Sequence, residues 1–304
     1  MNLPKYLKEK DSFFKIATEF IKVESGKSKT EKYTFFVDNK KYFLKVFNGN
    51  TEDKLNEIYE IYTKYNIPTP KLVYLKYFSE IDKTCLVNEY IKGKTLLEVM
   101  EEESVVDLEN LAFRIGKTLQ QFPLSASCKT DIIITMNNEL EELKKNAINL
   151  QNQVNDLAII DLRRIFDSLE INKKYVYSSD SYFIHGDITF NNILISNDNF
   201  YLIDIESGRE SFRILNFKGN WWWTWNGTNI LKEQAIYRGI YKGLFDAEIP
   251  KKFHKELGFT MIYTFLSRLN KYRENTGEVQ YTFSKFKEMF DNTNYFENYY
   301  FSWF

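Results

Sequence analysis

The chain has 304 residues, enough to bury a large core and to form two lobes or domains. Its 41 basic and 42 acidic residues give a net charge of −1, so bulk charge provides no reason to expect a nucleic-acid or membrane partner. Two cysteines are too few for a disulfide framework, and no apolar stretch reaches the roughly 20 residues that a membrane span needs. With no apolar signal segment at its start, the chain is expected to be cytoplasmic.

The first 90 residues are predicted to be rich in strands. Residues 1–22 are amphipathic, with apolar side chains at mixed helical spacing. Runs of β-branched and aromatic residues predict strands at 32–37, 41–47, 71–77 and 84–90. The turn Asp38-Asn39-Lys40 joins the first two strands as a hairpin. Between the two pairs, Asn50 or Thr51 begins a helix that ends near Tyr65, before a segment with two prolines.

Beyond residue 92 the sequence becomes mostly helical. Helices are predicted at about 95–103, 107–122, 131–153 and 156–170, and again after residue 229. A hairpin over 192–205 interrupts them. The predicted class is therefore α+β, with a small strand-rich lobe over 1–90 and a larger helical lobe over 91–304. A cleft between two lobes is a usual place for a small-molecule site.

The hairpin over 192–205 brings two polar side chains close together. A four-residue loop would place Asn192 opposite Ile203, whereas a five-residue loop would place Asn192 opposite Asp204. We predict the second register, in which both side chains point the same way. An amide oxygen and a carboxylate that converge in this manner suit Mg²⁺. Asn192 and Asp204 are therefore the predicted metal ligands.

Asp187 lies in the loop that leads into this hairpin. An aspartate beside a metal site can accept the proton of a substrate hydroxyl or orient the attacking oxygen. Gly186 allows a tight loop conformation that a side chain would strain. We expect His185 to brace the loop by hydrogen bonds rather than to take part in the chemistry.

The residues HGDITFNN, followed by LIDIE, resemble the kinase-like small-molecule phosphotransferases, the group of aminoglycoside phosphotransferases and choline kinases. The matching positions are His185, Gly186, Asp187, Asn192, Asp204 and Glu206. The resemblance covers about residues 20–217 and implies a bilobal protein-kinase-like fold. It also implies ATP or GTP and Mg²⁺ as cofactors, phosphoryl transfer to a hydroxyl, and Asp187 as the catalytic residue.

A lysine in the first lobe agrees with this resemblance. Lys45 lies in the apolar strand YFLKV, and a lysine enters a partly buried strand only with a partner. The resemblance implies that Lys45 holds the α and β phosphates of the nucleotide. Its anionic partner is expected on the following helix, where Glu57 is the first choice and Glu60 the second. Glu57 is equally compatible with a solvated helix position.

The resemblance implies further nucleotide contacts in three groups. Backbone N–H groups and hydroxyls of a short loop would face the phosphates. Backbone groups of the segment between the lobes would pair with the adenine edge, and apolar side chains would form the floor. The loop at the phosphates would contain Ser25, Gly26 and Ser28. The segment between the lobes would contribute Glu89 and Ile91, and the apolar floor would consist of Leu194 and Ile203.

The acceptor side departs from the family pattern. Residues 119–123 read LQQFP where the family often has Leu-His, and Arg213 stands where choline-kinase-like members have an Asp that caps and braces the next helix. Residues 207–304 hold 10 acidic side chains against 14 Lys and Arg, which does not favour a polycationic acceptor. The four tryptophans of Trp221–Trp225 could hold a quaternary ammonium or a ring. They could equally pack inside the lobe or form a dimer surface.

The resulting hypothesis is a nucleotide- and Mg²⁺-dependent O-phosphotransferase for a small hydroxylated molecule, with an aminoglycoside-type antibiotic as first choice. That acceptor would make the protein a resistance kinase, acting as a monomer or homodimer. A choline-like or other metabolite kinase is the first alternative. The second alternative is a kinase-shaped binding or coat protein without catalysis.

Overall fold

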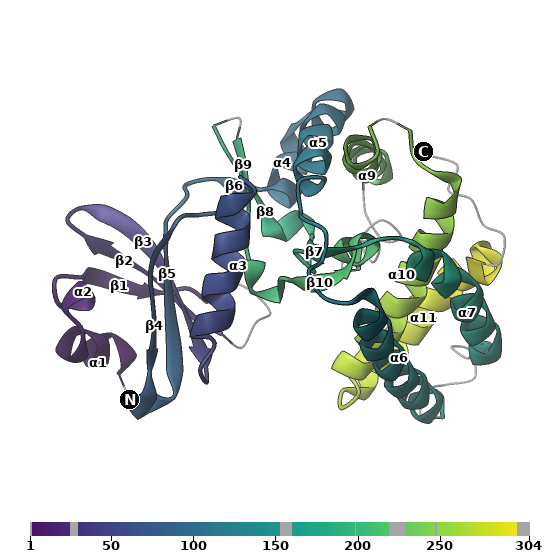
Figure 1. Ribbon diagram of the computed structural model, residues 1–304, viewed down its shortest axis with the longest axis horizontal. Coiled ribbons are helices and arrows are strands. Elements are labelled where there is room, and N and C mark those ends of the chain that lie inside the picture. Colours follow the sequence, from purple (N-terminus) through teal and green to yellow (C-terminus); the bar gives the residue numbers. More distant parts are fainter. Residues whose placement is uncertain are drawn as a thin grey trace. The chain divides into compact units, whose positions relative to one another are not determined.

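The computed structural model describes residues 2–24, 30–152, 160–197, 199–218, 229–246 and 248–296. The chain forms two compact units (Figure 1). The first unit comprises Met1–Lys94 and Leu194–Glu206, and the second comprises Thr95–Ile193 and Ser207–Phe304. The contacts thus group the segment Leu194–Glu206 with the N-terminal part of the chain. The division into functional lobes at residue 90 stays a prediction.

An antiparallel sheet with the strand order β1-β2-β3-β5-β4 forms the base of the first unit (Figure 1). Its strands are β1 (Thr18–Lys22), β2 (Glu31–Val37), β3 (Lys40–Asn48), β4 (Leu72–Phe78) and β5 (Lys83–Glu89). The four predicted strands are confirmed, each within about one residue at either end. In the turn between β2 and β3, Asp38 has φ 48° and Asn39 has φ 62°. Two consecutive positive φ angles are typical of a hairpin turn that matches the twist of its strands.

Helix α3 (Glu52–Lys64) packs against β4 and confirms the predicted helix. The buried side chains Leu55, Ile58, Tyr59 and Tyr62 recur at intervals of three and four residues, so they share one face. The helix begins where Asn50 Oδ1 accepts a hydrogen bond from the Glu52 N–H at 3.1 Å. Its opposite face is exposed to solvent.

The N-terminal segment forms two short helices, α1 (Leu3–Lys10) and α2 (Ser12–Lys15), rather than one amphipathic stretch that continues to residue 22. Asp11 separates the helices because its backbone is extended, with φ −139°, and its carboxylate accepts from the Phe13 N–H at 2.9 Å. Phe13 stacks on Tyr74 at 4.8 Å between ring centroids, and Phe20 stacks on Phe35 at 4.9 Å. This aromatic core holds the helices on the sheet.

The second unit is mostly helical. Its helices are α4 (Leu96–Glu102), α5 (Val105–Leu119), α6 (Lys129–Gln151), α7 (Leu162–Ser178), α9 (Ile230–Leu244), α10 (Lys251–Lys271) and α11 (Thr276–Asn292). The helix predicted at 156–170 lies further along the chain, as α7. Asp161 caps its start by accepting from the Arg164 N–H, and Val176 extends the buried face of Ile165 and Leu169 beyond residue 170.

Helices α5 and α9 pack with their backbones in close contact. A Cβ atom added at Gly116 would lie 2.0 Å from the Ile240 carbonyl oxygen, and one at Gly239 would lie 2.4 Å from the Glu109 carbonyl oxygen. Only glycine allows this approach. Glu109 also joins the two helices, since its carboxylate accepts from Arg238 at 2.5 Å and from Lys242 at 2.9 Å.

Short strands flank the His-Gly-Asp segment. Strand β7 (Ser181–Ile184) pairs with β10 (Arg209–Phe212), and the order of the small second sheet is β6 (Lys94–Thr95), β8 (Ile193–Ser196), β9 (Asn199–Leu202). The predicted hairpin is therefore present, but Ser196 and Asn199 belong to its strands. The connection is thus shorter than the five-residue loop of the predicted register, and that loop length is wrong. Short 3₁₀ turns link these strands: η3 (Phe190–Asn192), η4 (Ile205–Ser207) and η5 (Arg213–Phe217). Two others are η1 (Ser79–Ile81) and η6 (Asn294–Phe296).

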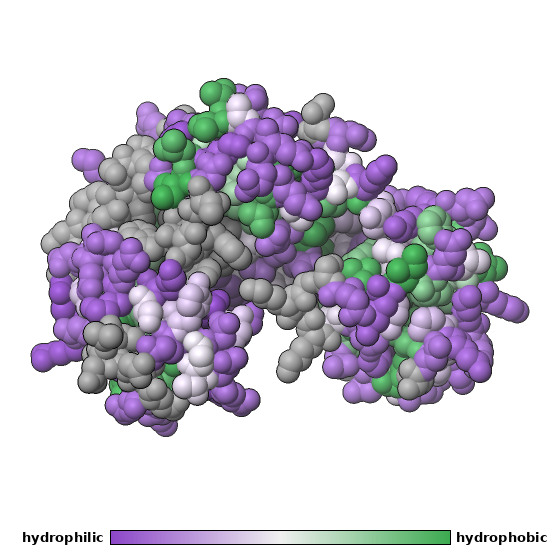
Figure 2. All heavy atoms as spheres, turned by 180° about the vertical axis from the view of Figure 1, so that it is seen from behind, coloured by the Kyte–Doolittle hydropathy of each residue, from purple (hydrophilic) through white to green (hydrophobic). Residues whose placement is uncertain are grey.

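The coloured surface in Figure 2 is mainly hydrophilic, with hydrophobic residues in separate groups. The most exposed large apolar side chains, such as Leu231, Val106 and Leu124, come from different elements. Within the described ranges, no helix combines the length and the apolar character that crossing a membrane would require.

Candidate active site

Lys45 lies in the middle of β3 and is only 5% exposed. Its ammonium donates to Asp204 Oδ1 and, at 3.0 and 3.2 Å, to the two carboxylate oxygens of Glu206. All three residues belong to the first unit. Burial alone would lower the pKa of Lys45, but the carboxylates of Glu206 and Asp204 hold it above its usual value. The site therefore contains a charged, buried ammonium between two carboxylates.

These partners correct the prediction that Glu57 would pair with Lys45. Glu57 lies on the exposed face of α3, opposite Ile58 and Tyr59. The sequence spacing allowed this residue to reach the sheet, but the buried face of the helix is taken up by apolar side chains. Glu206 occupies the place we assigned to Glu57, and its signal was present as the last acidic residue of LIDIE.

The residues predicted to contact the nucleotide base also belong to the first unit. Ile91, Leu194 and Ile203 are half-buried, so part of each apolar side chain is open to solvent. The Glu89 N–H donates to the Lys71 carbonyl at 3.0 Å, and its carboxylate accepts from Lys40 at 2.6 Å. The base-binding roles of these residues stay predictions. The predicted phosphate loop of Ser25, Gly26 and Ser28 and the cluster Trp221–Trp225 lie outside the described residues.

Asp187 lies in the second unit, in the loop between β7 and η3. Its carboxylate is half-exposed, and its Oδ2 accepts from Asn192 Nδ2 at 3.0 Å. The same Nδ2 donates to the Asp187 carbonyl at 2.9 Å. The buried amide of Asn192 therefore closes the loop and fixes the position of the Asp187 carboxylate with neutral hydrogen bonds.

Two neighbours fix the backbone of Asp187. His185 is fully buried, and its Nδ1 accepts from the Asp187 N–H at 3.3 Å, which is the bracing contact expected of it. Gly186 has φ 81°, a region where L side chains are strained, and a Cβ there would lie 2.7 Å from the Ser207 carbonyl oxygen. Both observations explain why these residue types precede the aspartate.

Asn216 is a part of the site that sequence reasoning missed. It is 1% exposed, its Oδ1 accepts from the Gly186 N–H at 3.1 Å, and its carbonyl accepts from the Ile188 N–H at 2.8 Å. Arg213 stands at the position where the resemblance implies a bracing Asp. Asn216, three residues later and alone among apolar neighbours, is the residue that braces the loop, and its isolation in the run ILNF was the available signal.

Cationic side chains lie close to the loop that carries Asp187. Arg209 pairs with Ile184 at the end of β7, one residue before His185. Burial, together with Arg209, lowers the pKa of Lys218 to about 8, although Asp187 and Glu139 act in the opposite direction. This lysine is thus within electrostatic reach of the Asp187 carboxylate.

Asn192 and Asp204 have the ligand chemistry that Mg²⁺ requires, an amide oxygen and a carboxylate. Because Asn192 uses its Nδ2 to hold Asp187, its Oδ1 faces away from that contact. Asp204 has φ 61°, a left-handed conformation that Asp tolerates better than most residues. The two residues belong to different compact units, so the metal pair stays a prediction. Among the described residues, no group of three or more His, Cys, Asp and Glu side chains could hold a metal.

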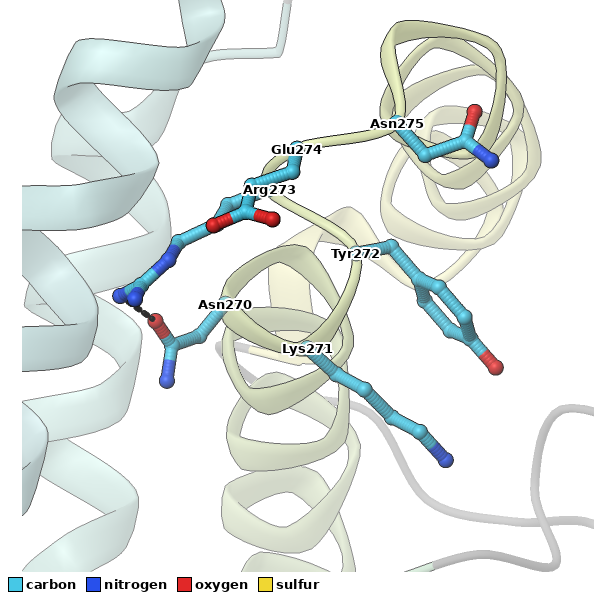
Figure 3. A pocket seen from close by; sticks show the side chains of 6 residues that line it. All are labelled: Asn270, Lys271, Tyr272, Arg273, Glu274 and Asn275. Carbon is cyan, nitrogen blue, oxygen red and sulfur yellow. Dashed lines mark hydrogen bonds between the residues drawn. The ribbon is translucent and has the colours of Figure 1, made fainter. Parts of the chain in front are cut away.

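A cavity of about 390 Å³ lies in the second unit, at the turn between α10 and α11 (Figure 3). Six consecutive residues, Asn270–Asn275, line it. Arg273 reaches back across this turn and donates to Asn270 Oδ1 at 3.3 Å. No predicted site residue lines this hollow.

An antiparallel sheet with a charged lysine in its central strand, and a separate helical unit with the His-Gly-Asp loop, define a protein-kinase-like phosphotransferase fold. A family model described as the phosphotransferase enzyme family matches residues 22–209, and the chain belongs to that family. The protein is accordingly a phosphotransferase.

Solved structures agree with this fold. The apo form of a thermostable mutant of aminoglycoside phosphotransferase APH(4)-Ia has 15% identity and a TM-score of 0.66, over 95% of this chain and 98% of that one. Spectinomycin phosphotransferase APH(9)-Ia with ADP and spectinomycin has 17% identity and a TM-score of 0.60, over 94% of each chain. The gentamicin complex of APH(2")-IIa has 16% identity and a TM-score of 0.65, over 93% of this chain and 94% of that one. No curated protein matches the sequence.

Proposed function

We propose that the protein transfers a phosphoryl group from ATP or GTP to a hydroxyl of a small molecule, with Mg²⁺ as cofactor. The observation that carries the proposal is the buried ammonium of Lys45 between Asp204 and Glu206. A lysine that is kept charged and ordered in this way can bind the phosphates of a nucleotide. Ser25, Gly26 and Ser28 would add contacts above the phosphates, and Ile91, Leu194 and Ile203 would cover the base.

Asp187 is the proposed catalytic residue. Its half-exposed carboxylate would accept the proton of the acceptor hydroxyl and orient the oxygen for attack. The hydrogen bonds from Asn192 keep the carboxylate in place before the acceptor arrives, which supports catalysis by positioning. Asn192 and Asp204 would hold Mg²⁺, and that ion would neutralise charge on the phosphates.

An aminoglycoside-type antibiotic is the first candidate for the acceptor. The solved structures similar to this chain include complexes of hygromycin B, spectinomycin and gentamicin with their own phosphotransferases. The protein would then be a resistance kinase. A second candidate is a metabolite kinase with a less cationic acceptor, which the positions of Arg209 and Lys218 near the catalytic loop favour.

Two measurements test the proposal in sequence. The first is the melting temperature of the full chain with ATP or GTP, each with and without Mg²⁺; we expect at least one nucleotide to raise it in an Mg²⁺-dependent manner. The second is nucleoside diphosphate release against a panel of aminoglycosides, macrolides, other hydroxylated antibiotics and choline. If no nucleotide raises the melting temperature, the kinase mechanism is wrong; nucleotide binding without turnover on any acceptor would favour a binding protein.

A further inference from the structure

A second cavity, of about 110 Å³, lies in the helical unit away from the residues assigned above. It is formed where the end of α7, strand β7, the β10–η5 segment and the start of α10 meet. Its lining combines polar and charged side chains with apolar walls. These lining residues include Ser179, Tyr182, Phe212, Arg213, Lys252 and Glu256. The reaction proposed above uses none of them.

Arg213 is the unusual residue of this cavity. Its Nε is buried and has no hydrogen-bond partner, and within the described part of the chain the guanidinium makes no ion pair. Its close contact is with the ring of Tyr182, whose centroid lies 3.7 Å from the guanidinium carbon. Burial lowers the pKa of Arg213, so neighbouring carboxylates do not compensate for the lost hydration. Arg213 as a whole is half-buried, so its guanidinium keeps one unfilled donor, the Nε–H, that a hydrogen-bond acceptor would satisfy.

Glu256, the nearest buried carboxylate in the lining, is already engaged. Its Oε1 accepts from the Ser179 hydroxyl at 2.5 Å, and Lys252 Nζ lies 3.9 Å from the same oxygen. Lys252 in turn donates to Ser179 Oγ at 3.0 Å. Glu256, Ser179 and Lys252 therefore satisfy one another. The other carboxylate of the lining, Asp180, is exposed to solvent, and together with Glu256 it acts against the lowering of the pKa of Arg213 without offsetting the effect of burial.

The walls limit what can enter. Phe212, Ile214, Phe253 and Val176 are almost fully buried and present apolar surface. A volume of about 110 Å³ holds on the order of three to four waters, or one small oxyanion with a few carbon atoms. A planar oxyanion matches the fork of the guanidinium with two parallel hydrogen bonds, and an apolar remainder would contact the aromatic wall.

We propose that this cavity is a binding site for a small oxyanion, a carboxylate or a phosphate, with Arg213 as its main ligand. A bound anion would connect β7 and η5 to α7 and α10 within the helical unit. Because Tyr182 on β7 precedes His185 by three residues, the site would stabilise the strand that leads into the catalytic loop. The site is independent of the acceptor and of the nucleotide.

The test uses the purified full chain without nucleotide or Mg²⁺, so a failure of the kinase proposal does not affect it. Sodium acetate and sodium phosphate are titrated at pH 8 against sodium chloride of equal ionic strength, and melting temperature and heat of binding are measured. We expect a saturable rise of a few degrees for at least one of the two anions. Arg213→Met should abolish that rise, whereas Lys251→Met, an exposed residue beside Lys252 that does not line the cavity, should retain it.

Glu256→Gln is expected to raise the affinity for the anion, whereas the Arg213 substitutions lower it. The amide keeps an acceptor for Ser179 but removes a negative charge from the cavity, so anion affinity should increase at least about threefold. If Arg213→Met fails to fold, Arg213→Lys serves instead, since it keeps the charge without the fork and should weaken binding. The proposal is overturned if neither anion binds saturably, or if binding is unchanged in the Arg213 variants.

Discussion

The two units of the chain prepare their functional residues in different ways. In the first unit, opposite charges hold one another: the ammonium of Lys45 is balanced by Asp204 and Glu206. In the second unit, the loop that carries Asp187 is held by neutral groups, the amides of Asn192 and Asn216. A substitution that changes a charge should therefore disturb the arrangement around Lys45. The loop of Asp187 should instead be disturbed by a substitution that removes a hydrogen bond or alters the packing.

This difference has a chemical reason. A lysine that binds phosphates must remain charged when buried, and only anionic partners can offset its desolvation. An aspartate that accepts a proton must not be tied to a permanent cation, because a strong ion pair would reduce its basicity. Amide donors orient the Asp187 carboxylate without that cost.

The largest expected effect comes from removing the charge of Asp187. Asp187→Asn should reduce turnover on any acceptor by about 10²- to 10⁴-fold, since the proton acceptor is lost. The melting temperature should stay within about 2 °C of the wild type, because the substituted amide oxygen can still accept from Asn192. Nucleoside diphosphate release and thermal unfolding measure the two quantities.

Asp131→Asn is the matched control for this change, since Asp131 is exposed on α6. Its turnover should equal that of the wild type. Near-normal turnover of Asp187→Asn would remove this residue from the catalytic role.

A smaller effect, divided between binding and stability, is expected for Lys45→Met. The variant leaves Asp204 and Glu206 without their cation, and these side chains are 33% and 27% exposed, so solvent compensates in part. We expect a loss of about 1–3 kcal/mol in the free energy of unfolding, together with loss of the nucleotide-dependent rise in melting temperature. Denaturant unfolding and thermal shift with nucleotide measure both.

The control for Lys45→Met is Lys64→Met, at the exposed end of α3 in the same unit. It should keep both stability and nucleotide response. If nucleotide still raises the melting temperature of Lys45→Met as much as that of the wild type, then the charge cluster around Lys45 does not serve nucleotide binding.

The smallest effect tests an ion pair in the scaffold of the second unit. Hydrogen bonds from Arg238, outweighing burial, lower the pKa of Glu109 to about 2, below its unfolded value. Glu109 thus adds stability above about pH 4.5, and this contribution declines as the pH falls toward 2. Glu109→Gln should cost about 1 kcal/mol at pH 7, and the difference in melting temperature from the wild type should shrink below pH 4.5.

Glu103→Gln, on an exposed residue near the end of α4, is the control and should show no such pH-dependent difference. A Glu109→Gln deficit that is equal at pH 7 and pH 3.5 would mean that the pair acts by packing rather than by charge.

Local signals made most of the first unit predictable. Hydrophobic alternation and the Asp38-Asn39 turn predict β2 and β3, because neighbouring residues determine both. Lys45 was identified as a buried cation in need of a partner, but its partners come from residues about 160 positions later. Sequence spacing along α3 could not reveal them, since only the fold brings β9 and the segment after it to β3.

The loop that carries Asp187 shows the same limit of prediction from sequence. His185, Gly186, Asp187 and Asn192 were found because they are consecutive or five residues apart. Asn216 was missed because its role depends on the return of the chain through β10 and η5 to the loop. The start of α7 was misplaced because Asp156, which precedes an apolar run, has the same residue type as Asp161, the cap of α7.

The close approach of α5 and α9 has a consequence for any mutational screen. A side chain at Gly239 would push α9 from α5 and carry Tyr237, two residues earlier, away from Phe190, whose ring lies 5.3 Å from it. Phe190 begins the 3₁₀ turn that ends at Asn192. A search for inactive variants should therefore recover substitutions of a buried glycine that touches neither nucleotide nor acceptor, and those variants would be failures of spacing rather than of chemistry.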